Sequence, residues 1–188
     1  KLPAAAKTQG FHDLTILDLA SGTSTILAVG YRPVAVGFAE SGTGTGTTPT
    51  QAYAVTQDGV ALIDLKGSPL VTKNIAISDS PTEDPGTRDV FVTRDGTRAF
   101  VRRDGSNKIT VVTLANDARS EIELTGPVTD LDLADTGDRA VAVVRDTATV
   151  SVLPIADPTN DKDFAVTGET IGSVAIAPGG GKALLYTN

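Results

Sequence analysis

The side chains best suited to hold a charged ligand gather at two short turns in the second half of the sequence. These candidates are Arg102, Arg103, Asp104 and Asn107 at the first turn, and Arg145 and Asp146 at the second. A guanidinium forms paired hydrogen bonds with carboxylates and phosphates, so the turns, together with Lys108, could form an anion or carboxylate site. The competing interpretation, which we favour, is that these arginines form surface ion pairs with Asp104 and Asp146.

Two acidic stretches offer oxygen ligands for calcium, which takes about six to eight of them. The stretches contain Asp79, Glu83, Asp84 and Asp89, and then Asp157, Asn160, Asp161 and Asp163. Neither has the alternating spacing of a calcium-binding loop, and both contain proline and turn-forming residues. We therefore interpret both stretches as solvated turns and predict no metal ligands.

Catalytic residues are harder to find. His12 is the only histidine, and it directly precedes Asp13 at the start of a predicted strand. A catalytic histidine needs side chains that orient it, and no Ser-His-Asp arrangement can be assembled around this imidazole. The glycine-threonine run at Gly42 to Gly46 lacks a lysine and precedes no predicted helix, so it is not a phosphate loop. We predict no catalytic residue and no cofactor.

Composition narrows the class of protein. The 188 residues carry a net charge of −7, 40% are hydrophobic and only 4% are aromatic. The acidic balance disfavours nucleic-acid binding, which requires clustered cations, and no apolar run is long enough to predict a membrane span. The absence of cysteine excludes disulfides and thiolate metal sites. Because the sequence begins at Lys1 and contains no methionine, we expect a processed protein or a segment of a longer one.

The elements that would position these residues are short strands that repeat. Phe100 to Thr113 is a strand, a turn and a second alternating strand, and related segments recur along the chain. In the third strand of each unit the corresponding residues are Leu14, Val60, Ile109 and Val150, at separations of 46, 49 and 41. In the first strand they are Val34, Val90, Leu131 and Val174. A period in the forties with four strands per unit predicts an all-β propeller of four-stranded antiparallel blades, rather than a β-sandwich.

The repeat divides the chain. Residues 1–10 are predicted to be a linker or arm. The following segments are a half blade at 11–30, blades at 31–78, 86–125 and 126–168, and a half blade at 169–188. We favour a segment of a longer propeller over a closed ring of four blades. First strands line the central channel of a propeller, so Asp132 is expected to face water there or to pair with an arginine of the next blade.

Individual motifs resemble those of a known family. Phe100-Val101-Arg102-Arg103 followed by Ser106-Asn107-Lys108-Ile109 is similar to the pattern of YVTN-type β-propeller repeats, and Tyr186-Thr187-Asn188 keeps three letters of that signature. Val60 to Asp64 matches its other half, whereas Thr113 and Pro154 replace the expected aspartate. The resemblance implies membership of the seven-bladed, quinoprotein-like propeller superfamily, whose members are typically secreted or surface proteins of bacteria and archaea.

The resemblance implies a non-catalytic propeller that serves as a structural or protein-interaction scaffold. Its partner would be another protein or the remaining blades of the same polypeptide. The implied location is extracellular, at the cell surface or periplasmic. Two alternatives stay open: a lactonase- or quinoprotein-like propeller enzyme, and a carbohydrate- or anion-binding module that uses the arginine-rich turns.

Overall fold

The computed structural model describes residues 12–40, 49–78 and 82–187, and the chain divides into two compact units, Lys1–Pro85 and Gly86–Asn188. The predicted arm at residues 1–10, the glycine-threonine run and Asp79 lie outside the described residues. Among those that are described, no helix has the length and apolar character needed to cross a bilayer.

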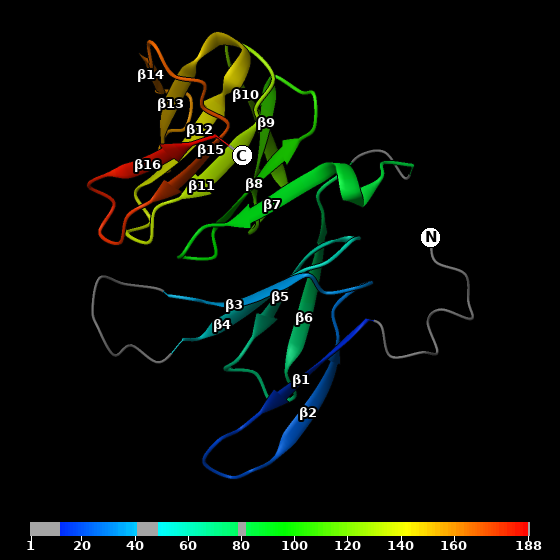
Figure 1. Ribbon diagram of the computed structural model, residues 1–188. Coiled ribbons are helices and arrows are strands. Elements are labelled where there is room, and N and C mark those ends of the chain that lie inside the picture. Colours follow the sequence, from blue (N-terminus) through cyan, green and yellow to red (C-terminus); the bar gives the residue numbers. More distant parts are fainter. Residues whose placement is uncertain (1–11, 41–48, 79–81, 188) are drawn as a thin grey trace. The chain divides into compact units, whose positions relative to one another are not determined.

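The N-terminal unit contains a hairpin and one four-stranded sheet (Figure 1). Strands β1 (Asp13–Leu17) and β2 (Ser24–Ala28) form the hairpin. The sheet consists, in chain order, of β3 (Ala35–Ala39), β4 (Gln51–Val55), β5 (Gly59–Asp64) and β6 (Val71–Ala76). Every neighbouring pair is antiparallel.

Apolar side chains of the hairpin cover one face of this sheet. Leu14, Ile16 and Leu27 pack against Ala54 and Ile63, both of which are fully buried. Ala52 and Ala54 of β4, and Ala61 and Ile63 of β5, share this face, because alternate side chains of a strand point to the same side. Strand β6 of the sheet also contacts β2 of the hairpin directly, since the Thr72 hydroxyl donates a hydrogen bond of 3.2 Å to the Ala28 carbonyl.

The C-terminal unit contains two four-stranded sheets and one hairpin, all antiparallel. The first sheet consists of β7 (Arg88–Val92), β8 (Arg98–Arg103), β9 (Lys108–Thr113) and β10 (Ala118–Glu123). The second consists of β11 (Asp130–Leu133), β12 (Arg139–Val144), β13 (Thr149–Pro154) and β14 (Lys162–Ala165). The hairpin is formed by β15 (Ser173–Ile176) and β16 (Ala183–Tyr186).

The turn between the first and second strands is repeated closely in the two large sheets of this unit. Gly96 and Gly137 adopt φ angles of +67° and +72°, in the left-handed region that glycine enters without steric cost. In both turns the glycine N–H donates a 2.8 Å hydrogen bond to a carbonyl three residues earlier, that of Thr93 or of Ala134. The repeated glycine in the sequence therefore marks a repeated backbone geometry.

Strand β12 is buried on both faces, as expected for the interior of a stack of sheets. Its residues Ala140, Ala142 and Val144 belong to an apolar layer that also contains Phe100 and Ile109 of the first sheet. Val141 and Val143 point the other way and pack with β15 of the hairpin. The side chains on both faces are small or β-branched, which suits closely stacked sheets.

The prediction of an all-β chain with three four-stranded sheets and two half-size ones is confirmed. The sequence did not predict the short 3₁₀ helix η3 (Arg145–Thr147), which forms the turn between β12 and β13. Lys108 begins β9, because Arg102 pairs with Ile109 across the β8–β9 hairpin.

Candidate functional site: polar contacts between neighbouring sheets

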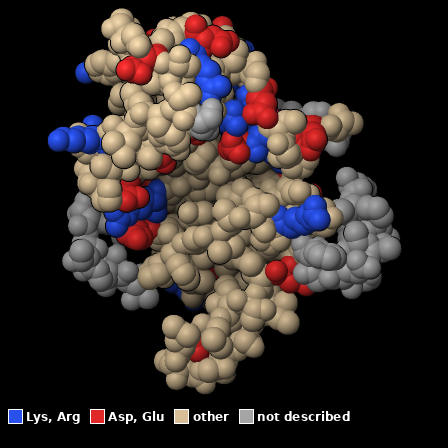
Figure 2. Space-filling model, in the orientation of Figure 1, with Lys and Arg blue, Asp and Glu red and all other residues tan. Residues whose placement is uncertain are grey.

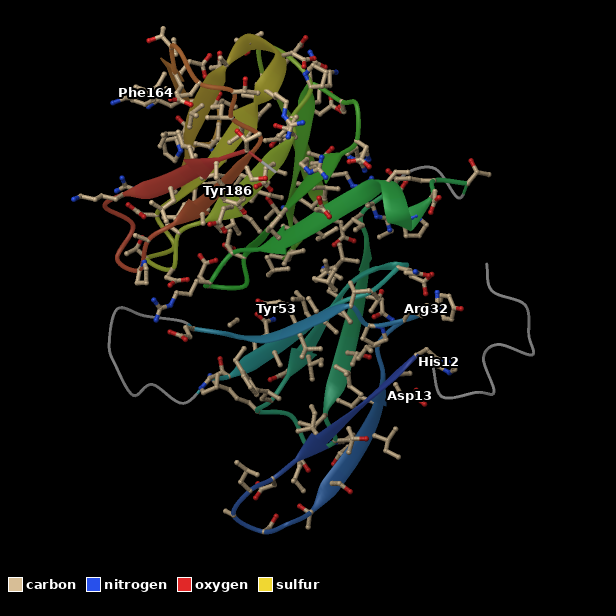
Figure 3. The ribbon with its side chains drawn as sticks, in the orientation of Figure 1. His12, Asp13, Arg32, Tyr53, Phe164 and Tyr186 are labelled. Carbon is tan, nitrogen blue, oxygen red and sulfur yellow. The ribbon has the colours of Figure 1, made fainter. Side chains whose placement is uncertain are left out.

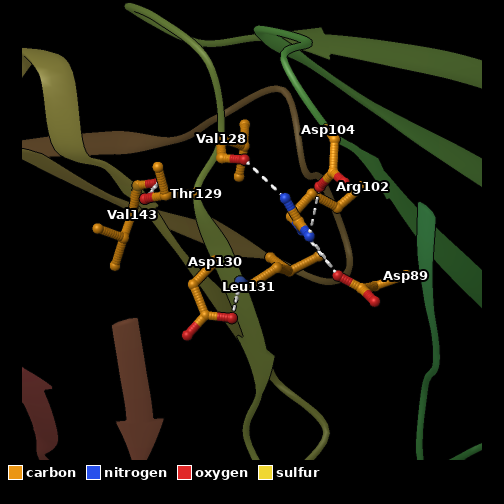
Figure 4. A network of polar contacts seen from close by, with 8 residues as sticks. All are labelled: Asp89, Arg102, Asp104, Val128, Thr129, Asp130, Leu131 and Val143. Carbon is orange, nitrogen blue, oxygen red and sulfur yellow. Dashed lines mark hydrogen bonds and ion pairs between the residues drawn. The ribbon is translucent and has the colours of Figure 1, made fainter. Parts of the chain in front are cut away.

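Arg102 lies at the centre of a polar network in the C-terminal unit (Figure 4). Its Nη2 lies 2.5 Å from Asp89 Oδ2 on β7 and 3.0 Å from Asp104 Oδ1 in the turn after β8. Its Nε also donates to Asp89, at 2.9 Å, and its Nη1 donates to the Val128 carbonyl at 3.0 Å. Val128 precedes β11, so this one side chain connects the first sheet with the segment that enters the second.

Burial and charge act in opposite directions on this guanidinium. The Arg102 side chain is only 13% exposed, and burial by itself would lower its pKa. The hydrogen bond and charge of Asp89, with the smaller contribution of Asp104, outweigh burial and raise the pKa of Arg102 above its ordinary value. The arginine therefore stays charged, and three of its nitrogens already donate within the network. The predicted pairing of Arg102 with Asp104 is present; an anion would have to displace these contacts.

The other predicted residues of this turn contact their own sheet. Arg103 Nη1 donates to the Thr110 hydroxyl at 2.8 Å, and Asn107 Nδ2 donates to Glu123 Oε1 at 3.2 Å. Lys108 Nζ lies 2.7 Å from Glu121 Oε2, and the hydrogen bond from this pair raises the pKa of Lys108. The turn thus presents paired charges between adjacent strands.

Arg145 and Asp146 lie in the equivalent turn of the second sheet. They begin η3, and both side chains are exposed. Ala148, which directly follows η3, has a φ angle of +49° and donates its N–H to the Arg145 carbonyl at 3.0 Å. The structure thus gives the two turns different geometries: Asp104-Gly105 in the first sheet and a 3₁₀ turn in the second. Asp104 forms an ion pair with Arg102 in the first sheet, whereas Asp146 lies in η3 of the second sheet.

Asp132 contacts the backbone of the next strand pair. Its Oδ2 accepts a 2.7 Å hydrogen bond from the Ile176 N–H on β15, and its Oδ1 accepts one of 2.9 Å from the Leu133 N–H. Asp130, two residues earlier on the same side of β11, accepts from the Val174 N–H at 2.9 Å. Asp132 thus contacts amides, because β15 turns N–H groups that β16 does not use toward β11. The expectation that Asp132 faces water in a central channel stays a prediction.

Two further arginines join the first sheet of the C-terminal unit to the second. Arg94 Nη1 donates to the Asp135 carbonyl at 2.6 Å, and Arg98 Nη2 donates to the Ala156 carbonyl at 3.2 Å. The sequence interpretation missed both contacts and the role of Asp130. A signal was present only for Asp130, since two aspartates spaced by two residues on a first strand must share a face.

The remaining candidates have local roles. Asp157 Oδ1 accepts from the Thr159 hydroxyl at 2.7 Å, and Asp163 Oδ1 accepts from the Ser151 hydroxyl at 2.5 Å. His12 Nε2 lies 3.9 Å from Asp13 Oδ1 at the beginning of β1 (Figure 3). Within the described parts of the chain, no three histidine, cysteine, aspartate or glutamate side chains gather as a group able to hold a metal ion.

The charged surface follows the same pattern of local pairing. On the face of the C-terminal unit shown in Figure 2, basic and acidic side chains lie next to one another instead of forming a large patch of one sign. Arg139 and Asp138 form an ion pair of this unit, at 2.6 Å. Their hydrogen bond, assisted by Thr136, lowers the pKa of Asp138 from 3.8 to about 2.

Comparisons with known proteins identify the fold. No family model matches the sequence, and no curated protein matches it significantly. Among solved structures, the chain is similar to a hydrazine synthase from Kuenenia stuttgartiensis, with a TM-score of 0.50 and 19% identity over 90% of this chain and 47% of that one.

Two further solved structures give higher TM-scores. The dihydro-heme d1 dehydrogenase NirN in complex with DHE has a TM-score of 0.59 and 18% identity, over 94% of this chain and 37% of that one. The Cps50 (Swd1) β-propeller domain of Myceliophteria thermophila has a TM-score of 0.56 and 13% identity, over 95% of this chain and 60% of that one. This chain thus spans between 37% and 60% of the length of these structures. At such low identities the likeness shows the fold alone: the chain is built from β-propeller blades.

Proposed function

We propose that this chain is a non-catalytic β-propeller scaffold of the YVTN type, acting in the periplasm, at the cell surface or outside the cell. The blade fold and the sequence motifs around Phe100 to Thr113 support the assignment to that type. The proposed partner is a protein, either the remaining blades of the same polypeptide or a separate chain.

The observation that carries the scaffold proposal is the use made of Arg102. A ligand-binding arginine needs nitrogens that face the ligand, whereas Arg102 directs its Nε, Nη1 and Nη2 to Asp89, Val128 and Asp104. Asp130 and Asp132 are used in the same way, each accepting from two backbone amides. The charged side chains best able to bind a ligand therefore hold neighbouring sheets together, as a scaffold requires.

The test compares ligand classes on the folded chain. Thermal melts would be recorded with calcium, with inorganic phosphate and with a sulfated polysaccharide, and binding to a fraction of extracellular proteins from the source organism would be measured in parallel. We expect no rise in Tm with calcium, phosphate or the polysaccharide. We expect binding to the protein fraction to be saturable and to be competed by an excess of the unlabelled chain. A Tm rise of several degrees with calcium, without saturable protein binding, would overturn the scaffold proposal in favour of a metal-dependent propeller enzyme.

An anion- or carbohydrate-binding module is the second candidate, and the exposure of Arg145 supports it. In this case Arg103 and Arg145 would contribute more than Arg102, whose Nε, Nη1 and Nη2 all donate within the network. Arg103→Ala combined with Arg145→Ala would abolish binding of the sulfated polysaccharide if this candidate is right. Unchanged binding in that double variant would eliminate it, and Lys182→Ala provides a control that removes a charge elsewhere.

A further inference from the structure

The inner strand of the C-terminal hairpin has amides that β16 does not use. Ala177 N donates to the Lys182 carbonyl, which fixes the odd-numbered residues of β15 as those that exchange hydrogen bonds with β16. Hydrogen bonds alternate along an antiparallel pair, so the N–H groups of Val174 and Ile176 point away from β16. Left unpaired, such groups would form an open sheet edge.

Two carboxylates on β11 receive these amides. Asp130 Oδ2 accepts from Val174 N at 2.9 Å, and Asp132 Oδ2 accepts from Ile176 N at 2.7 Å. The Oδ1 atoms accept from Leu131 N and Leu133 N of β11 itself, each at 2.9 Å. Each carboxylate thereby joins one amide of β11 to one amide of β15, although the two strands belong to different sheets. Hydrogen bonds to an ionised acceptor are stronger than those between neutral groups.

The arrangement is specific to this pair of strands. The residues of β7 that correspond to Asp130 and Asp132 are Asp89 and Phe91, and Asp89 is held by Arg102. A phenylalanine side chain carries no acceptor. The described strand β3 offers only Ala35 at the position of Asp132. The other first strands therefore lack the paired carboxylates.

Among the described residues, strands β15 and β16 pair only with each other. Leu184 and Tyr186 remain 73% and 50% exposed on β16. The other face of this hairpin contributes Val174 and, less deeply buried, Leu185 to the apolar layer against β12. One apolar face and two carboxylates thus connect the hairpin to the second sheet.

We propose that Asp130 and Asp132 form a latch, and that opening this latch releases β15–β16 from the second sheet as one cooperative unit. Release uncovers the apolar face of β12 that contains Val141 and Val143, both buried while the latch is closed. The latch acts between two elements that otherwise fold with their own internal hydrogen bonds. Sub-global opening of this kind proceeds in contiguous units, so the amides within the hairpin must lose protection together.

The first test is hydrogen exchange on the full chain carrying Asp130→Asn and Asp132→Asn. Asparagine is nearly isosteric but replaces one acceptor oxygen with an NH₂ donor, so each residue can keep only one of its two amides. Faster exchange at Val174 and Ile176 alone would follow from the lost hydrogen bonds. The latch predicts in addition that Ala177 and the amides of β16 exchange faster by about tenfold or more, because hydrogen bonds to charged groups hold the hairpin. Protection that is retained at Ala177 and β16 overturns the proposal.

A second test uses the absence of cysteine from the chain. Val143→Cys places a single thiol on the face of β12 under the hairpin, and Val144→Cys places one on the opposite face of the same strand. Both valines are 0% exposed. In the latch variant, thiol labelling should accelerate about tenfold at position 143 and remain unchanged at position 144. Equal acceleration at both positions would indicate general destabilisation and would also overturn the proposal.

Asp135→Asn is the control for each single substitution, since it makes the same change, with the loss of one carboxylate charge, in the exposed turn that follows β11. It should leave exchange and labelling unchanged. If the double variant does not fold, Asp132→Asn alone is used. Labelling at position 143 should then be faster in this single variant than with the wild-type aspartate. If the single variant labels at the wild-type rate while the Ile176 amide exchanges faster, Asp132 only accepts a hydrogen bond from that amide. This result would overturn the latch proposal.

Discussion

The two boundaries between sheets in the C-terminal unit are joined by opposite chemistry. Between the first and second sheets, arginines donate to backbone carbonyls: Arg102 to Val128, Arg94 to Asp135 and Arg98 to Ala156. Between the second sheet and the β15–β16 hairpin, Asp130 and Asp132 accept from backbone amides. Cationic side chains therefore satisfy backbone carbonyls at the first boundary, and anionic side chains satisfy backbone amides at the second.

The apolar contacts differ between the boundaries as well. The first boundary contains Phe100, which is fully buried, together with leucines and isoleucines of both sheets. The second is built mainly from valines, including Val141, Val143 and Val174. Larger side chains remove more apolar area from water, so the first boundary depends mostly on its apolar layer and the second more on its polar contacts. This difference predicts how each boundary responds to substitution.

The largest effect is expected for Phe100→Ala. Truncation of a fully buried phenylalanine removes its transfer free energy and leaves a cavity, at a cost of about 3–5 kcal/mol in the free energy of unfolding. At the second boundary, Val174→Ala removes two methyl groups' worth of apolar surface and should cost about 2 kcal/mol. Urea denaturation of both variants measures the difference. Equal losses would contradict the view that the first boundary depends more strongly on apolar packing.

A smaller loss is expected for Arg102→Ala. The substitution leaves Asp89 without its cationic partner and the Val128 carbonyl without its donor, which should cost about 1–2 kcal/mol of unfolding free energy because Asp89 is half exposed and can be hydrated. Urea denaturation again provides the measurement. Arg145→Ala, at the exposed turn of the other sheet, should change stability by less than about 0.5 kcal/mol.

A double-mutant cycle sharpens this result. If Arg102 stabilises the boundary through Asp89, the losses from Arg102→Ala and Asp89→Ala should be smaller in combination than their sum. Additive losses would mean that Arg102 acts mainly through Val128 and Asp104. Arg102→Lys keeps the charge but cannot reproduce the forked geometry, so its loss should be intermediate.

The apolar framework could be predicted from sequence because it repeats. The corresponding third-strand residues Val60, Ile109 and Val150 are all buried, and Leu14 packs against the core of its unit. Spacing and alternation determine such positions, since a pleated strand exposes the same face at every second residue. The turn glycines Gly96 and Gly137 recur at the same spacing, and both adopt a positive φ angle that favours glycine.

The polar contacts between sheets could not be predicted in the same way. Pairing of Arg102 with Asp104 follows from their proximity in sequence, but its bond to the Val128 carbonyl joins residues 26 positions apart. Asp130 and Asp132 bind amides 44 positions away. Every residue except proline carries an amide, so a sequence does not indicate which amide an aspartate will contact until the strand edges are known. The pattern of two aspartates on one face of β11 was the only local signal.

The smallest effect concerns the carboxylates in the two equivalent turns, Asp95 in the first sheet and Asp138 in the second. Burial opposes the ionisation of Asp95, but hydrogen bonds from Thr93 and Thr97 outweigh it and lower its pKa. Asp138 depends instead mainly on Arg139, which with Thr136 lowers its pKa to about 2. A lowered pKa in the folded state means that the stabilisation is present above pH 3.8 and is lost as the pH falls through about 2.

Arg139→Gln should therefore raise the pKa of Asp138 toward 3.8 and leave that of Asp95 low, as measured by NMR titration of the side-chain carboxyls. Since both partners of the Arg139–Asp138 pair are nearly half exposed, solvent screening should keep the loss of stability at neutral pH small, and smaller than the loss from Arg102→Ala. A pKa of Asp138 that stays near 2 in the variant would assign its shift to Thr136. The two turns would then use the same hydroxyl chemistry, and the contrast between the sheets would be confined to the contacts that join them.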